Sequence, residues 1–327
     1  MKSNLTKTNR TSLLVLVVGL VYIVPSASAQ AAKAQAKIND ASSVAQRIER
    51  VENNFPPIAL GENEPPLQVN LQKLMEVYKV PGLSVAVIDN FKIVWAKGYG
   101  VTEAGTTTPV TTKTLFQAGS ISKPVAATGT LYLVEHGKLS LDEDVNRKLV
   151  SWKVPENEFT KDQKVTLRGL MSHSAGLTVH GFPGYAVDEP VPTLVQIFNG
   201  EKPANTAPIR VDIVPGTKFV YSGGGVTIEQ QLVMDVTGKP FPQFMRETVL
   251  DKIGMLESTY QQPLPPARAV LAASGTHTDG KVVRGKWHVY PEMAAAACGL
   301  HPRTWPGLPL KSRCPNRARQ ITCCPRR

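Results

Sequence analysis

Ser120 and Lys123 are the residues whose types and spacing most directly suggest chemistry. They lie in a Ser-Ile-Ser-Lys run, and positions i and i+3 share one face of a helix. A serine hydroxyl becomes a strong nucleophile when a neighbouring base takes its proton, and a lysine is such a base once desolvation or a nearby cation lowers its pKa. A helix that begins at Ser120 also directs free backbone N–H groups at developing negative charge. Alone, the pattern is a weak signal and is more typical of a surface helix. Ser122 competes for the nucleophile's role, although it is expected to face elsewhere.

Tyr221 is the second candidate, because it opens a Tyr-Ser-Gly-Gly-Gly run over residues 221–225, after Pro215-Gly216. Glycines let the backbone approach a ligand closely. A tyrosine held on such a loop can accept or donate a proton when neighbouring cations lower its pKa. The alternative interpretation is a structural turn before a helix, with Tyr221 packed on it.

The elements that must position these residues are a mixture of helices and strands. Two β-rich runs, 83–88 and 92–97, are separated by Asp89-Asn90-Phe91 and predict an antiparallel hairpin. Asp279-Gly280 predicts a second, smaller hairpin turn. Apolar spacing and end signals predict helices over residues 42–51, 67–78, 120–136, 165–171 and 226–237.

The net charge of +11 sits mainly at the two ends of the chain. Three basic residues lie within 1–29 and seven within 298–327, with no acid in either segment. The intervening residues 30–297 hold 27 basic and 26 acidic residues and are therefore nearly neutral. A nucleic-acid-binding surface is not expected from this distribution.

Residues 1–29 have the three parts of a secretion signal. Basic residues precede an apolar run from Leu13 to Val24, and Ala27-Ser28-Ala29 supplies a small-x-small cleavage pattern. The run is short for a membrane span. We therefore expect cleavage after Ala29 and a periplasmic or secreted protein; the alternative is an uncleaved N-terminal anchor. Residues 30–65, rich in Ala, Gln, Asn and Pro, are expected to form a mobile arm.

Residues 298–327 lack apolar periodicity and hold all four cysteines and five prolines. Disulfides are one interpretation for an exported protein. A one-base shift of the reading frame near residues 294–297 is another. Back-translation in the shifted frame gives Leu-Trp-Thr-Pro-Pro-Glu-Asp-Leu-Ala-Arg-Phe-Ala-Ile-Glu-Ile-Gln, a loop followed by an amphipathic helix. A genuine lineage-specific tail is the third.

Several stretches together resemble the serine β-lactamase-related hydrolases: class C β-lactamases, D-alanyl-D-alanine peptidases and esterases of the same fold. In chain order they are residues 80–87, 116–123, 170–177, 215–216 with 221–223, and 253–255. The resemblance covers roughly residues 67–297. It implies an α+β fold, an antiparallel sheet flanked by helices plus a helical subdomain, with the sheet incomplete in this chain.

By this resemblance Ser120 is the acyl-accepting nucleophile, Lys123 its partner and Tyr221 the proton shuttle. The implied reaction is acyl transfer to water through an acyl-enzyme on an ester, amide or β-lactam. The backbone N–H of Ser120 supplies half of the oxyanion hole. His173 is not included, because its His-Ser-x-Gly-Leu context is structural in the family and a packed histidine is the more frequent case.

Two departures from the family pattern bear on activity. Gly223 stands where β-lactamases have the Asn of Tyr-x-Asn, which lowers the expectation of penicillin hydrolysis. The third motif, Lys/His-Thr/Ser-Gly on a strand, is absent after Tyr221, and the stretch over 277–280 has an extra residue. If the third motif is missing, the second oxyanion donor and the remaining strands of the family's sheet are missing too. Little or no turnover is therefore expected.

The expected function is an exported serine hydrolase for a small-molecule or peptide substrate, with no metal, no cofactor and no nucleic-acid partner. The alternatives are a non-catalytic sensor domain that binds penicillin or a peptidoglycan peptide, and a frameshift product without function. The expected organisation is a signal peptide over 1–29, the arm over 30–65, the hydrolase domain over 66–297 and an aberrant tail over 298–327.

Overall fold

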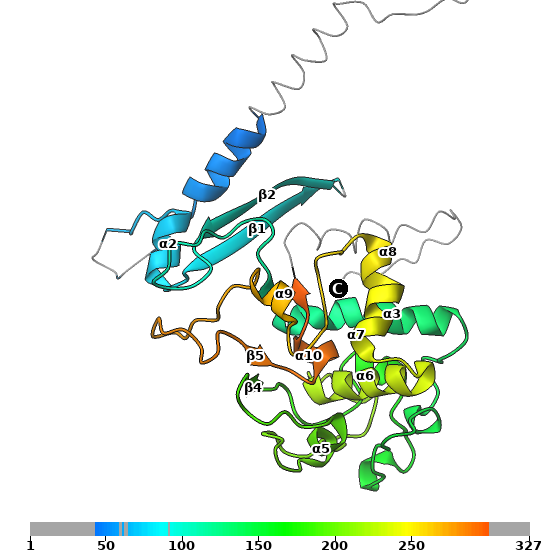
Figure 1. Ribbon diagram of the computed structural model, residues 1–327. Helices are drawn as coiled ribbons and strands as arrows, with labels where there is room; N and C mark the ends of the chain where they lie inside the picture. Colours follow the sequence, from blue (N-terminus) through cyan, green and yellow to red (C-terminus); the bar gives the residue numbers. More distant parts are fainter. Residues whose placement is uncertain (1–42, 59–60, 62–64, 91, 301–327) are drawn as a thin grey trace, which may run out of the picture. The chain divides into compact units, whose positions relative to one another are not determined.

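The computed structural model describes residues 43–58, 61, 65–90 and 92–300 (Figure 1). The chain divides into two units, Met1–Val51 and Glu52–Arg327. A helix over residues 43–53 agrees with the one expected over 42–51. The expected signal peptide, the first part of the expected arm and the tail beyond Leu300 lie outside the described residues.

The expected hairpin is present. Strand β1 (Gly82–Asp89) pairs antiparallel with β2 (Lys92–Gly100), with a register shift between Val87 and Ile88. Helix α2 (Leu71–Val77) precedes it and begins four residues later than predicted. It does so because the Asn70 side chain caps it, accepting the N–H of Lys73 at 2.8 Å.

The core is helical and is built around α3 (Ser122–Glu135) and α6 (Gly223–Thr237). Every residue of α6 from Gly223 to Val233 is buried. Around them lie α7 (Phe241–Met245), a π-helical turn (Arg246–Leu250), α8 (Asp251–Ile253) and α10 (Met293–Ala296). Figure 1 shows α10 beside α6 and α3, although it lies far along the chain from both.

Helix α6 begins three residues earlier than predicted, since the glycines expected in a loop form its first turn. Ser222 caps the helix by accepting the N–H of Gly225 at 2.9 Å. Close packing explains the glycines: a Cβ on Gly224 would lie 2.9 Å from the carbonyl oxygen of Thr178, and one on Gly223 would lie 3.0 Å from the Phe182 ring.

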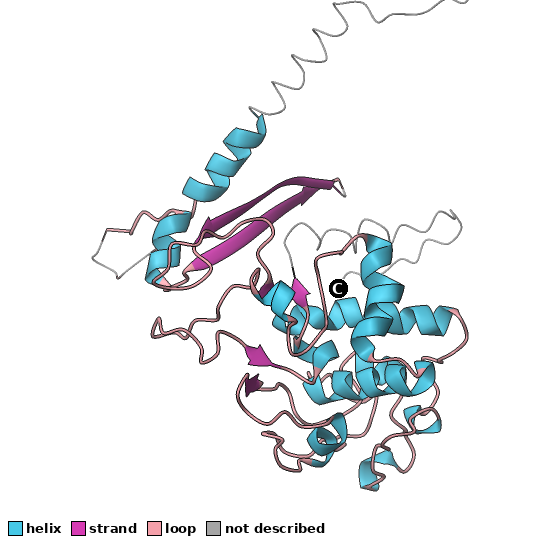
Figure 2. Cartoon of the chain, in the orientation of Figure 1, coloured by secondary structure: helices cyan, strands magenta, loops and turns pink. Residues whose placement is uncertain are grey.

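The remaining elements are short (Figure 2). Helices are α4 (Leu167–Met171), α5 (Leu194–Asn199) and α9 (Pro266–Ala269). Strand β3 (Phe116–Gln117) pairs with β6 (Gly299–Leu300), and β4 (Tyr185–Ala186) pairs with β5 (His288–Val289). The fold is therefore the expected mixture of helices and antiparallel strands, and each sheet within the described ranges has two strands.

The predicted turn at Asp279-Gly280 also forms. The N–H of His277 donates to the carbonyl of Lys281 at 2.8 Å, and Thr276 bridges Val282. Among the residues that the structure describes, no helix combines the length and apolar character that crossing a bilayer requires.

Two carboxyl groups lie inside the core. Glu229 on α6 accepts a hydrogen bond from the Thr130 hydroxyl at 2.6 Å, and burial raises its pKa to about 7 despite this bond. Both carboxyl oxygens of Glu292 are buried without a hydrogen-bond partner in the structure, and burial raises its pKa to about 7 as well. Both groups are therefore protonated in the folded chain at mildly acidic pH.

Stability is expected to fall as the pH rises from about 4.5 to about 7. In this window the unfolded chain has lost the proton of Glu229 while the folded chain still holds it, so ionisation favours unfolding by on the order of 3 kcal/mol at the upper end. Glu229→Gln keeps the acceptor for Thr130 and should flatten the dependence of the melting temperature on pH. The exposed Glu257→Gln is the matched control and should not; equal slopes in all three proteins would contradict the expectation.

Candidate active site

Ser120 lies in a 3₁₀ turn (Gly119–Ile121) that leads directly into α3. Gly119 has a φ of +53°, a conformation that glycine adopts without strain. The turn is tied to the segment after α10, because the N–H of Ala118 donates to the carbonyl of Cys298 at 2.9 Å. The nucleophile predicted from the sequence is exposed, at the N-terminal end of the partly buried helix α3.

The structure brings the three predicted site residues together. Lys123 Nζ donates to Ser120 Oγ at 3.1 Å, and the Tyr221 hydroxyl donates to the same oxygen at 2.8 Å. Lys123 Nζ is held from behind by the carbonyl of Ala295 at 2.7 Å. It also lies 5.0 Å from the centre of the Tyr221 ring. This arrangement lets a proton move between Ser120 and either neighbour.

The pKa of Tyr221 lies below its ordinary value. Burial alone raises this pKa, but hydrogen bonding with Lys123 and Ser120, together with the Lys123 charge, outweighs the effect of burial. A tyrosine whose ionised form is stabilised in this way is a better acceptor for a serine proton.

Ser122, the competing nucleophile, is fully buried. Its hydroxyl donates to the carbonyl of Gly119 at 2.6 Å and accepts the N–H of Cys298 at 2.9 Å. Its own carbonyl accepts the hydroxyl proton of Tyr260 at 2.6 Å. These contacts make Ser122 a structural link between the nucleophile's turn and residue 298.

Cys298, the first residue of the expected tail, lies among the described residues. The residue is fully buried, and burial raises the pKa of its thiol to about 12. Gly299 then pairs with Gln117, next to the nucleophile's turn.

His173, omitted from the predicted site, lies against Tyr221 with 4.4 Å between the ring centres. Its Nδ1 accepts the N–H of Ser222 at 3.2 Å. His180 Nδ1 donates to the Tyr221 carbonyl at 2.5 Å. The available sequence signal was the presence of two histidines shortly after α4, but nothing local connects them to residue 221.

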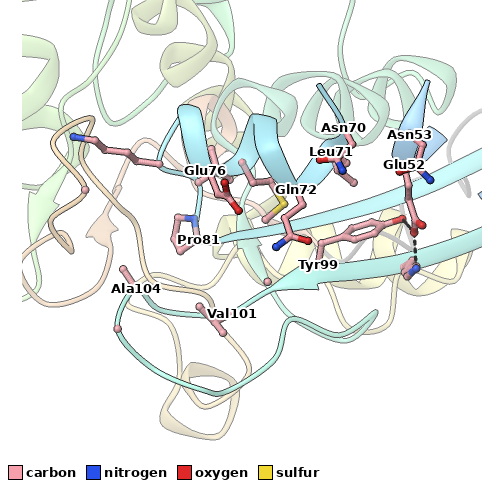
Figure 3. Close-up of a pocket in the computed structure, with 17 residues that line it drawn as sticks. Glu52, Asn53, Asn70, Leu71, Gln72, Glu76, Pro81, Tyr99, Val101 and Ala104 are labelled. Atoms are coloured by element: carbon pink, nitrogen blue, oxygen red, sulfur yellow. Dashed lines mark hydrogen bonds and ion pairs between the residues drawn. The ribbon is translucent and has the colours of Figure 1, made fainter. Parts of the chain in front are cut away.

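A separate cavity of about 750 Å³ lies between α2 and the end of β2, and none of the three predicted site residues lines it (Figure 3). Three of its polar lining residues contact one another: Glu52 pairs with Lys97 and accepts the Tyr99 hydroxyl at 2.9 Å. Gly280 lines this cavity, which places the 277–280 stretch there. Across the described ranges, no cluster of three or more His, Cys, Asp or Glu side chains could hold a metal ion.

The chain is similar in sequence to several known proteins. A β-lactamase from Pseudomonas fluorescens is 32% identical over 216 residues, which are 65% of this chain and 55% of the relative. An unguisins hydrolase from Aspergillus violaceofuscus is 26% identical, over 68% of this chain and 40% of the relative. The chain thus spans about half the length of the curated relatives it matches.

Solved structures show the same fold. A β-lactamase/D-alanine carboxypeptidase from Yersinia pestis superposes with a TM-score of 0.58 at 19% identity, over 72% of this chain and 64% of the other. An octameric penicillin-binding protein homologue from Pyrococcus abyssi gives 0.56 at 25% identity, over 72% and 53%. The β-lactamase family model matches residues 67–302, and the chain belongs to this family of hydrolases.

Proposed function

We propose that this chain is an exported serine acyl hydrolase that forms an acyl-enzyme on Ser120. The observation that carries the proposal is that a single oxygen, Ser120 Oγ, is bonded to both Lys123 Nζ and the Tyr221 hydroxyl. A basic run and a small-x-small pattern within residues 1–29 support export.

Acylation begins with attack of Ser120 Oγ on the substrate carbonyl carbon. Tyr221, in its ionised form, takes the serine proton as the new C–O bond forms, and Lys123 stabilises the phenolate. Tyr221 then gives this proton to the leaving amine or alcohol as the substrate's acyl bond breaks. In the second half, Tyr221 takes a proton from a water molecule as its oxygen attacks the acyl carbon. The bond between the acyl carbon and Ser120 Oγ then breaks, the carboxylic acid leaves, and Tyr221 returns the proton to Ser120 Oγ.

The proposed substrates are esters or amides, including peptide amides, ahead of penicillins. β-Lactamases and penicillin-binding proteins are among the relatives. In this chain, however, Gly223 lies inside α6 and has no side chain with which to hold an acyl-amide group. The 277–280 stretch, which most resembles the third motif, is a turn beside the separate cavity.

Turnover is proposed to be impaired. The N–H of Ser120, in the nucleophile's turn, is the one oxyanion donor proposed here, and loss of a second donor typically costs roughly 10²–10³ in rate. Loss of the second oxyanion donor also favours a second candidate function. This is a sensor that binds penicillin or a peptidoglycan peptide, becomes acylated and does not release the acyl group. A frameshift product without function remains the third hypothesis.

Acylation measured separately from turnover tests the proposal. The purified chain, first shown to melt cooperatively, is incubated with a fluorescent penicillin and with a fluorophosphonate, and the adduct is found by intact mass. Hydrolysis of nitrocefin or a p-nitrophenyl ester is followed in parallel. Label with turnover supports the hydrolase, retained penicillin label without turnover supports the sensor, and a folded chain that takes neither label overturns both.

A further inference from the structure

His173 binds the backbone on both sides of Tyr221. Its carbonyl accepts the N–H of Val220 at 2.7 Å, and its ring Nδ1 accepts the N–H of Ser222 at 3.2 Å. Between these two bonds lies the residue whose hydroxyl reaches Ser120. The His173 ring also packs on the Tyr221 ring, with 38° between their planes.

His173 is itself held in a conformation that few side chains adopt. Its φ is +56°, in the left-handed region that is unfavourable for most residues other than glycine and that Asn, Asp and His tolerate better. The N–H groups of His173 and Ser174 bond back to the carbonyls of Leu170 and Gly169 in α4. The imidazole is therefore anchored to a buried helix while it binds the segment before α6.

The bond to Ser222 requires one tautomer. An imidazole nitrogen that accepts a backbone N–H carries no proton, so the ring must be neutral with its proton on Nε2. Burial and the charge of Lys123 lower the pKa of His173, which keeps the ring neutral over most of the physiological range. Lys123 from α3 and the Tyr221 phenol are the titratable groups that face this ring, and His180 binds the Tyr221 carbonyl.

We propose that His173 is a positioning residue whose neutral imidazole clamps the Ser222 backbone and so holds the Tyr221 hydroxyl on Ser120 Oγ. Protonation places an N–H against the Ser222 N–H and breaks the clamp, so acylation stops in acid. The inference rests on the proposed function, because the acylation of Ser120 is what the clamp serves.

Two substitutions separate this role from a merely structural one. His173→Asn retains a side-chain acceptor, tolerates the left-handed backbone and does not titrate. His173→Gly relieves the backbone and removes the acceptor. Fluorophosphonate labelling rates are measured from pH 4.5 to 8, with melting temperatures recorded alongside.

We expect the labelling rate of the Asn variant to be within about fivefold of the wild-type rate at pH 7.5. The part of the decrease in labelling rate at acidic pH that comes from protonation of His173 should be absent from this variant. The Gly variant should label at least tenfold more slowly across the range. Wild-type labelling by the Gly variant, or an unaltered acid limb in the Asn variant, would overturn the inference.

Two measurements do not depend on acylation, so they test the role of His173 even if the proposed function is wrong. Nitrogen-15 NMR of the imidazole should show His173 protonated on Nε2 at pH 7.5, and an Nδ1-protonated ring would contradict the clamp. If the wild-type chain takes no label, ultraviolet titration of the tyrosines provides the test. The tyrosinate absorbance of Tyr221 is identified as the signal that Tyr221→Phe removes, and the midpoint pH of this signal should shift in His173→Gly. An unshifted signal would overturn the role of His173.

Discussion

Ser120→Ala is expected to abolish covalent labelling of the chain by both fluorophosphonate and penicillin probes. The variant removes the oxygen on which Lys123 and Tyr221 converge and leaves the 3₁₀ turn intact. Because the side chain is exposed, the melting temperature should change by no more than a few degrees. Intact mass after incubation with each probe gives the result directly.

Ser122→Ala is the matched control, two residues away in the same run. It leaves the buried N–H of Cys298 without its acceptor, while the carbonyl of Gly119 keeps the backbone N–H of residue 122, so it should lower stability by about 1–3 kcal/mol. Labelling at Ser120 should nevertheless persist in the folded fraction. A probe that still modifies Ser120→Ala, or that maps by peptide mass to another residue, would contradict the assignment of the nucleophile.

Lys123→Met is expected to slow labelling of Ser120 by roughly 10²–10⁴. Methionine keeps much of the side-chain volume but removes the donor to Ser120 Oγ and to the Ala295 carbonyl. It also removes the cation that lowers the pKa of Tyr221, so the remaining activity should require higher pH. Labelling rates between pH 6 and 10 measure both effects.

Lys239→Met provides the comparison for Lys123→Met. Lys239 forms an exposed ion pair with Glu247 at 2.6 Å, and loss of such a pair costs little. This variant should label at the wild-type rate with an unchanged pH dependence. If Lys123→Met is labelled as fast as Lys239→Met, then Lys123 is not needed and Tyr221 alone activates Ser120.

Local signals in the sequence predicted much of the fold and the three residues that meet at the candidate site. The hairpin follows from alternating β-rich runs, and the end of α6 follows from Gly238, which caps it in the left-handed conformation. Ser120 and Lys123 come together because i and i+3 share a helical face. The glycine run singled out Tyr221, but only the family resemblance connected it with Ser120, which lies 101 residues away.

The contacts that support these residues were not predictable in the same way. Nothing near Lys123 indicates that its ammonium is held by the carbonyl of Ala295, 172 residues later. Every residue has a backbone carbonyl, so the residue types do not indicate which carbonyl accepts a hydrogen bond. His173 was left out of the predicted site because its His-Ser-x-Gly-Leu context is structural in the family and a packed histidine is the more frequent case. No spacing rule indicates its left-handed backbone or its bond to Ser222.

The Ala295 and Cys298 contacts also have a consequence for the order in which the chain matures. The ammonium of Lys123 and the hydroxyl of Ser122 receive these partners only after more than 170 further residues have been added. When Ser120 leaves the ribosome, these partners of Lys123 and Ser122 have not yet been synthesised. Ser120 is therefore not yet activated, since contacts between residues so distant in sequence form late in folding. Reactivity toward acyl donors is therefore expected only after the chain has been synthesised past residue 298 and has folded.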